Sequence, residues 1–147
     1  MAYAYRFQKV LEIKENEKEK SLADYNRSVS EFENAAEKLY SCLKKKEVLE
    51  DAAHTKLKGG MTVNEMRHMQ QFVINLDKTI EHFQKLVMIS RNRMNEKQHD
   101  LMEKNSEVKK YEKMKEKHFQ AYTEDEKTAE SRHMDELSIQ VYLAKGN

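Results

Sequence analysis

The strongest constraint on this chain is that its sequence carries one strong helix-ending signal, in the stretch Leu57–Met66. Gly59 and Gly60, two of the chain's three glycines, lie in this stretch, and the chain contains no proline. Gly59 suits the left-handed residue that follows the last turn of many helices. Lys56 and Lys58 suit the negative end of a helix. The stretch therefore predicts the end of a first long helix.

The same stretch contains the signals that begin a second helix. Thr62 and Glu65 have the spacing of a capping box, in which the threonine hydroxyl accepts a hydrogen bond from the Glu65 amide and the Glu65 carboxylate accepts one from the Thr62 amide. Met61 and Met66 occupy the positions of a hydrophobic staple. Because the two sets of signals are only a few residues apart, they predict a tight turn at Gly59-Gly60 between two antiparallel helices.

Apolar residues recur at helical spacing on both sides of the turn. After the turn, one series steps by seven residues throughout, as the heptad repeat of a left-handed coiled coil requires; it consists of Val73, Ile80, Val87, Met94, Leu101 and Val108. We therefore expect an all-α fold, a long antiparallel two-helix coiled-coil hairpin that forms a single domain over residues 1–147. The expected ranges are about 4–58 for the first helix, 59–62 for the turn, and about 63–142 for the longer second helix.

The two apolar stripes predict a register. If the chain reverses between Gly59 and Gly60, apolar residues of one helix face apolar residues of the other, in the pairs Leu43–Leu76, Leu39–Ile80, Ala36–Phe83 and Phe32–Val87. Farther from the turn the facing residues include Leu22 with Lys97, Lys18 with Leu101 and Glu15 with Lys104. Burying these charges would be costly, so we expect splayed layers there, with lysine stems packed and ammonium groups in water.

Composition and charge exclude several classes of function. The net charge is +1 with 36% charged residues of both signs, so no global electrostatic case exists for nucleic acid or an acidic membrane. The single Cys42 excludes an intramolecular disulfide and suits a reducing compartment. The first ten residues contain no long apolar run, so we expect no signal peptide or membrane span. The six histidines are scattered, and no phosphate-binding loop is present. The sequence therefore predicts no enzyme activity, no metal and no cofactor.

Two apolar regions exceed what a two-helix seam needs. In Met69–Phe83, the side chains of Phe72 and Thr79 lie beside the seam, and they either cover its edge or contact a partner. The expected second helix also continues past the first as a C-terminal arm from about residue 118, with no partner in the hairpin. This arm carries Phe119, Tyr122, Leu137 and Val141. It is either a frayed or folded-back end, or an arm that gains its partner from another protein.

Several motifs resemble the FliJ family of flagellar type III export proteins. The family pattern is a helical hairpin with a Q-Q-F-x-x-x-L-x-x-x-I run after the turn, which stands here as Gln70-Gln71-Phe72, Leu76 and Ile80. The opening Tyr5–Glu12 and the mid-helix segment Ser30–Asn34 resemble the family as well. The resemblance covers most of the chain.

The resemblance implies a cytoplasmic antiparallel coiled coil similar to the central stalk of rotary ATPases. FliJ-like proteins associate with the hexameric export ATPase, engage the cytoplasmic linker of the export gate, and bind export chaperones. The resemblance implies that they associate peripherally with the inner face of the cell membrane, and only through these partners.

Site residues follow from the same resemblance. The gate contact, carried over to this sequence, gives Gln71, Phe72 and Leu76. Thr79 and Phe83 continue that face, where some relatives have a small residue and a histidine. The C-terminal arm, with Phe119, Tyr122, Leu137 and Val141, would enter the ATPase ring together with the start of the first helix.

Two other interpretations of the coiled coil remain open. A prefoldin-like holding chaperone would grasp substrates with its coiled-coil tips, although such chains place β-hairpins near the coil and no alternating strand pattern is visible here. A purely structural protein would dimerise through the long second helix. Binding to the export ATPase and to the gate separates the three interpretations.

Overall fold

The computed structural model describes residues 3–145, and within this range the chain is helical without any strand. Helix α1 contains the 52 residues Gln8–Gly59, and helix α2 contains the 83 residues Val63–Lys145. The predicted all-α pair, with a longer second helix, is therefore confirmed. The ends of the expected domain, residues 1–2 and 146–147, lie outside the described range.

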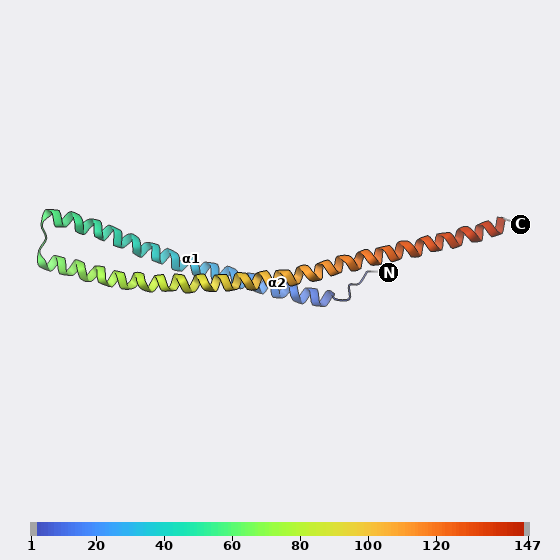
Figure 1. Ribbon diagram of the computed structural model, residues 1–147, viewed down its shortest axis with the longest axis horizontal. Helices are drawn as coiled ribbons and strands as arrows, with labels where there is room; N and C mark the ends of the chain where they lie inside the picture. Colours follow the sequence, from blue (N-terminus) through green and yellow to red (C-terminus); the bar gives the residue numbers. More distant parts are fainter. Residues whose placement is uncertain (1–2, 146–147) are drawn as a thin grey trace. The chain divides into compact units, whose positions relative to one another are not determined.

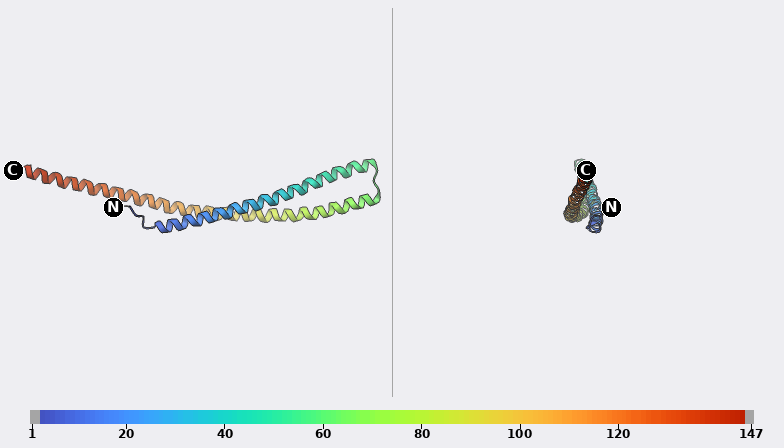
Figure 2. Two further views of the ribbon diagram at one scale, coloured as in Figure 1. Left: turned by 180° about the vertical axis from the view of Figure 1, so that it is seen from behind. Right: turned by 90° about the vertical axis from the view of Figure 1, so that its right-hand side faces the viewer.

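The described residues form two compact units. Unit 1 contains residues 3–19 and 103–145, and unit 2 contains residues 20–102. In unit 2 the chain reverses direction between the end of α1 and the start of α2, as Figure 1 shows and the rear view in Figure 2 repeats. No helix within residues 3–145 is both long and apolar enough to cross a membrane.

The turn between the helices is where the sequence places it, but the left-handed residue is Gly60 rather than Gly59. Gly59 is the last residue of α1, and Gly60 has a φ of 92°. One half of the capping box is present, since the Glu65 amide donates to the Thr62 hydroxyl at 3.2 Å. In the described part of the chain, the reciprocal bond from the Thr62 amide to the Glu65 carboxylate is not formed. The start of α2 is therefore capped by the threonine alone.

The core of unit 2 is a narrow seam between the helices. Buried Cys42, Leu76 and Ile80 form its centre, and Leu39, Leu49 and Phe83 pack against it. Leu39 and Ile80 therefore share one cluster, as the predicted register requires. A seam of this kind removes one stripe of each helix from water and leaves the remaining faces exposed.

The predicted partner of Leu76 on α1 was wrong. Leu43 is 44% exposed, whereas Cys42 is 8% exposed and belongs to the same buried cluster as Leu76. The seam face of α1 repeats every seven residues through Ser28, Ala35, Cys42 and Leu49. Three of these residues are small, so α1 approaches α2 along this line and turns the bulkier Leu43 outward.

Ion pairs across the seam of unit 2 fix the antiparallel direction. The Lys46 Nζ lies 2.8 Å from the Asp77 carboxylate, and the Arg93 guanidinium lies 3.0 Å from the Glu31 carboxylate. Moving toward the N-terminus of α1 thus corresponds to moving toward the C-terminus of α2. These groups are partly exposed, so the ion pairs contribute more to the alignment of the two helices than to the stability of the fold.

Unit 1 contains an ionic layer where splayed lysines were expected. The Lys14 ammonium lies 3.2 Å from the Glu107 carboxylate and 3.6 Å from that of Glu17, which lies 3.7 Å from Lys104 Nζ. Lys104 therefore pairs with Glu17, whereas the predicted register placed it opposite Glu15 without an ion pair. Leu11 and Val108 are the buried aliphatic residues of unit 1 within the described residues. Hydrogen bonding to Glu107 raises the pKa of Lys14, and the same bond lowers the pKa of Glu107.

Candidate protein-binding surfaces

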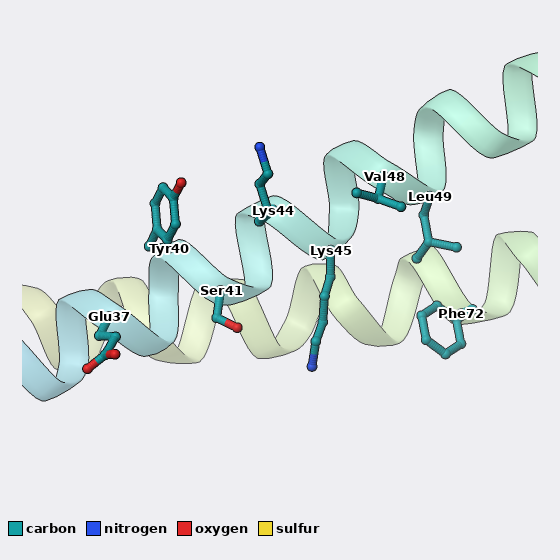
Figure 3. A pocket seen from close by; sticks show the side chains of 8 residues that line it. All are labelled: Glu37, Tyr40, Ser41, Lys44, Lys45, Val48, Leu49 and Phe72. Carbon is teal, nitrogen blue, oxygen red and sulfur yellow. The ribbon is translucent and has the colours of Figure 1, made fainter.

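An apolar groove opens on unit 2 beside Phe72, and we call it the Phe72 groove. Its volume is about 630 Å³. Figure 3 shows the Leu49 side chain of α1 directed toward the Phe72 ring of α2, with Val48 beside Leu49 and Tyr40 farther along α1. The residues Tyr40 and Phe72 are 67% and 56% exposed. Large side chains this exposed on one groove are typical of a protein-binding surface.

The polar edge of the Phe72 groove is mainly cationic. Its polar lining consists of Glu37, Ser41, Lys44 and Lys45. Lys44 forms one long ion pair with Glu47, at 3.9 Å on an exposed surface, where such pairs are weak. The lysines are therefore available to carboxylates of a bound segment.

The structure divides the predicted gate residues between the core and the surface. Gln71, Phe72 and Thr79 are exposed, whereas Leu76 is buried in the seam and Phe83 packs partly buried against it. Gln71 Nε2 donates to Asn75 Oδ1 at 3.2 Å, and the Thr79 hydroxyl donates to the Asn75 carbonyl at 3.1 Å. Leu76 and Phe83 therefore pack α2 against α1. Gln71, Phe72 and Thr79 remain accessible to a partner protein.

Sequence reasoning missed the part of the groove that α1 contributes. Tyr40 and Val48 line the groove from α1. Both are exposed, whereas Cys42 of the same helix is buried in the seam. The sequence could have indicated them, because both are large side chains at positions outside the seven-residue repeat that forms the seam face of α1. The surface around Phe72 thus comes from both helices rather than from α2 alone.

The C-terminal part of α2 is partnered at its start and unpartnered afterwards. The expectation that nothing covers it beyond residue 118 was wrong, because the Tyr3 ring lies 5.2 Å from the Phe119 ring and 5.3 Å from the Tyr122 ring. The Tyr122 hydroxyl also donates to Glu126, and that bond raises the pKa of Tyr122. Every described residue from 124 to 145 is exposed. The large apolar ones are Met134, Leu137, Ile139, Val141, Tyr142 and Leu143.

Residues 3–145 contain no group of histidine, cysteine and carboxylate side chains that could hold a metal ion. The Cys42 thiol is buried in the seam, where it packs as a small apolar side chain.

The fold and these surfaces define a two-helix coiled-coil protein that exposes apolar contact surfaces at separate places along the chain. Residues 3–147 match the family described as Flagellar FliJ protein. The Flagellar FliJ protein of Bacillus subtilis (strain 168) is 58% identical over 147 residues, which is the full length of both chains. The chain belongs to the FliJ family, and it is thereby a protein associated with flagellar type III export.

One solved structure shares the fold. It is a putative YscO homolog, CT670, from Chlamydia trachomatis, with a TM-score of 0.65 over 97% of each chain. The sequences are 17% identical, so this similarity concerns the two-helix architecture alone.

Proposed function

We propose that this protein is a non-enzymatic component of the flagellar export apparatus that links the export ATPase ring to the export gate and binds export chaperones. The observation that carries the proposal is the Phe72 groove, in which a half-exposed phenylalanine of the family's Q-Q-F run meets exposed apolar residues of α1. A second exposed apolar segment lies in unit 1, at the end of α2. Two separate contact surfaces suit a protein that works by joining partners.

The gate contact is assigned to the Phe72 groove, together with Gln71 and Thr79, which are exposed on α2. An amphipathic segment of the gate's cytoplasmic linker would insert apolar side chains between Phe72 and Tyr40. Its carboxylates would pair with Lys44 and Lys45, which border the groove. Aromatic residues in such a position are the ones whose truncation weakens binding most.

The ATPase contact is assigned to the C-terminal part of α2. Phe119 and Tyr122 would supply its aromatic part, and Leu137 and Val141 its exposed aliphatic part. Leu137 and Val141 are four residues apart, so they share one helix face. The proposed location is cytoplasmic and peripheral, at the inner face of the membrane, through these partners.

The test is a binding measurement with the full chain, the export ATPase and the cytoplasmic part of the export gate. We expect Phe72→Ala to weaken gate binding about tenfold, equivalent to about 1.4 kcal/mol. Ile74→Ala is the matched control, because Ile74 is similarly exposed on α2 but does not line the Phe72 groove. Circular dichroism would show that both variants keep their helices. Unchanged gate binding by Phe72→Ala would remove the groove assignment.

The same assay tests the ATPase contact. The double variant Leu137→Ala with Val141→Ala should lose ATPase binding and keep gate binding. Loss of both, or of neither, would contradict two separate contact surfaces.

A further inference from the structure

We propose that unit 1 carries a second groove that binds an arginine-bearing amphipathic helix of a partner. This groove, which we call the Tyr3 groove, has a volume of about 540 Å³ and lies where the N-terminal segment and the start of α1 meet α2. It is lined by Tyr3, Leu11 and Phe119, by the carboxylates of Glu15, Glu112 and Glu116, and by Lys115. The inference goes beyond the proposed function, which assigns Phe119 to the ATPase contact but gives no ligand chemistry for this groove.

The floor of the Tyr3 groove is aromatic and held in place. The Tyr3 ring packs edge-on against Phe119, and its hydroxyl donates to the backbone carbonyl of Lys115 at 3.4 Å. Leu11 is buried beneath, whereas Phe119 remains about half exposed. A fixed aromatic surface open to solvent attracts a cation, and a planar guanidinium most strongly.

The rim of the Tyr3 groove has an excess of negative charge. In the described part of the chain, Glu15, Glu112 and Glu116 form no ion pair, although Glu17 and Glu107 nearby are paired with lysines. Lys115 is the single basic residue of the lining within residues 3–145. Unpaired carboxylates around an apolar floor are complementary to a segment with both apolar and basic side chains.

The geometry favours arginine over lysine and a helix over an extended segment. Glu112 and Glu116 are one turn apart on α2, so they form one row of acceptors along the groove. A helix that lies along this row presents basic side chains at the same interval. Arginine can pair with a carboxylate through two parallel hydrogen bonds while its plane covers an aromatic ring. The ammonium group of lysine is not planar and cannot form two parallel hydrogen bonds with one carboxylate.

The experiment uses the full chain and three labelled amphipathic peptides of about 20 residues, long enough to form helices. They share one leucine stripe and carry arginine, lysine or glutamate at the flanking positions. Fluorescence anisotropy should show that the arginine peptide binds most tightly, the lysine peptide less tightly and the glutamate peptide not at all. Added salt should weaken binding of the arginine peptide.

Paired variants locate the site. Glu112→Gln combined with Glu116→Gln should weaken binding of the arginine peptide about tenfold. The control is Glu124→Gln with Glu130→Gln, which removes the same charge from exposed positions of α2 outside the groove. Phe119→Ala should weaken binding as well, with helicity checked by circular dichroism.

Three results would overturn the inference: no binding of the arginine peptide, equal binding of the glutamate peptide, or equal loss in both glutamate pairs. Binding to the export ATPase and gate is measured separately with variants at Phe72, Leu137 and Val141. A negative result for peptide binding at the Tyr3 groove therefore leaves the measurements of ATPase and gate binding unaffected.

Discussion

The ring of Tyr3 meets the ring of Phe119 edge to face, with centroids 5.2 Å apart and planes inclined at 77°. The two residues are separated by more than a hundred positions, and Tyr3 precedes the first residue of α1. Tyr5 follows the same pattern, since it is buried and its hydroxyl donates to the Tyr111 carbonyl at 3.2 Å. The N-terminal segment therefore extends the packing of unit 1 beyond the end of the paired helices.

Removing the Tyr3 ring should loosen this packing without unfolding the chain. We expect Tyr3→Ala to lower the free energy of unfolding of unit 1 by about 1 kcal/mol, the usual value of an aromatic pair beyond its buried area. Backbone amides of α2 near Phe119 should exchange hydrogen faster, which mass spectrometry measures. Tyr142→Ala is the control, because Tyr142 is an exposed tyrosine on α2. Equal exchange in wild type and Tyr3→Ala would show that the ring contact has no energetic role.

The turn and the two helices could be predicted because their signals are local. Paired glycines, a threonine cap and a seven-residue repeat each act within a few residues of chain. The face of α1 that packs against α2 could not be predicted in the same way. Both Cys42 and Leu43 are apolar, and the choice between them depends on how closely α2 approaches, which a single stripe does not encode. In the structure, the small residues Ser28 and Ala35 lie on the same face of α1 as Cys42 and permit the close approach.

The surfaces around the candidate residues follow from the sequence only in part, for a related reason. Phe72 is exposed, and Leu76 is buried in the seam, where the predicted register also places it. An apolar residue at a heptad position can serve either purpose in a sequence. The contribution of Tyr40 to the Phe72 groove, and of Tyr3 to the Tyr3 groove, depends on contacts between residues distant in sequence. Such contacts leave no periodic signal.

The two roles assigned to neighbouring residues of α2 can be separated by stability measurements. Leu76 is 8% exposed and forms one buried cluster with Cys42 and Ile80, so Leu76→Ala should destabilise the protein by about 2–4 kcal/mol. Phe72→Ala should change stability by less than about 1 kcal/mol, because its ring is mostly in water. Urea unfolding followed by circular dichroism gives both values. A large loss in Phe72→Ala would mean that its ring supports the fold, and its effect on gate binding would then be indirect.

The ionic layer of unit 1 should make stability depend on pH at both ends of the scale. The ammonium of Lys14 lowers the pKa of Glu107, so this carboxylate stabilises the fold above its ordinary pKa and stops doing so as the pH falls through the lowered value. The pKa of Lys14 is raised by Glu107, so its contribution is complete below its ordinary pKa and disappears as the pH rises through the raised value.

The variant that tests this is Glu107→Gln, followed by urea unfolding across the pH range. Wild type should exceed the variant in stability between about pH 5 and about pH 10, and the difference should narrow at either extreme. Glu124→Gln is the control, since Glu124 is exposed and should give no such profile. A difference that persists unchanged at about pH 2 would indicate that packing, and not charge, distinguishes glutamine from glutamate at this position.

The adjacent glycines of the turn should respond in opposite ways to alanine. Gly60 has a φ of 92°, a conformation that costs an L-residue about 1–2 kcal/mol, so Gly60→Ala should lower the free energy of unfolding by about that amount. Gly59 is the last residue of α1, where alanine is the better helix former, so Gly59→Ala should be neutral or stabilising by up to about 1 kcal/mol. No atom lies within 4 Å of an added Cβ at either position, so steric clash cannot cause a difference between the variants. Equal destabilisation in urea unfolding would contradict the assignment of Gly60 as the one left-handed residue of the turn.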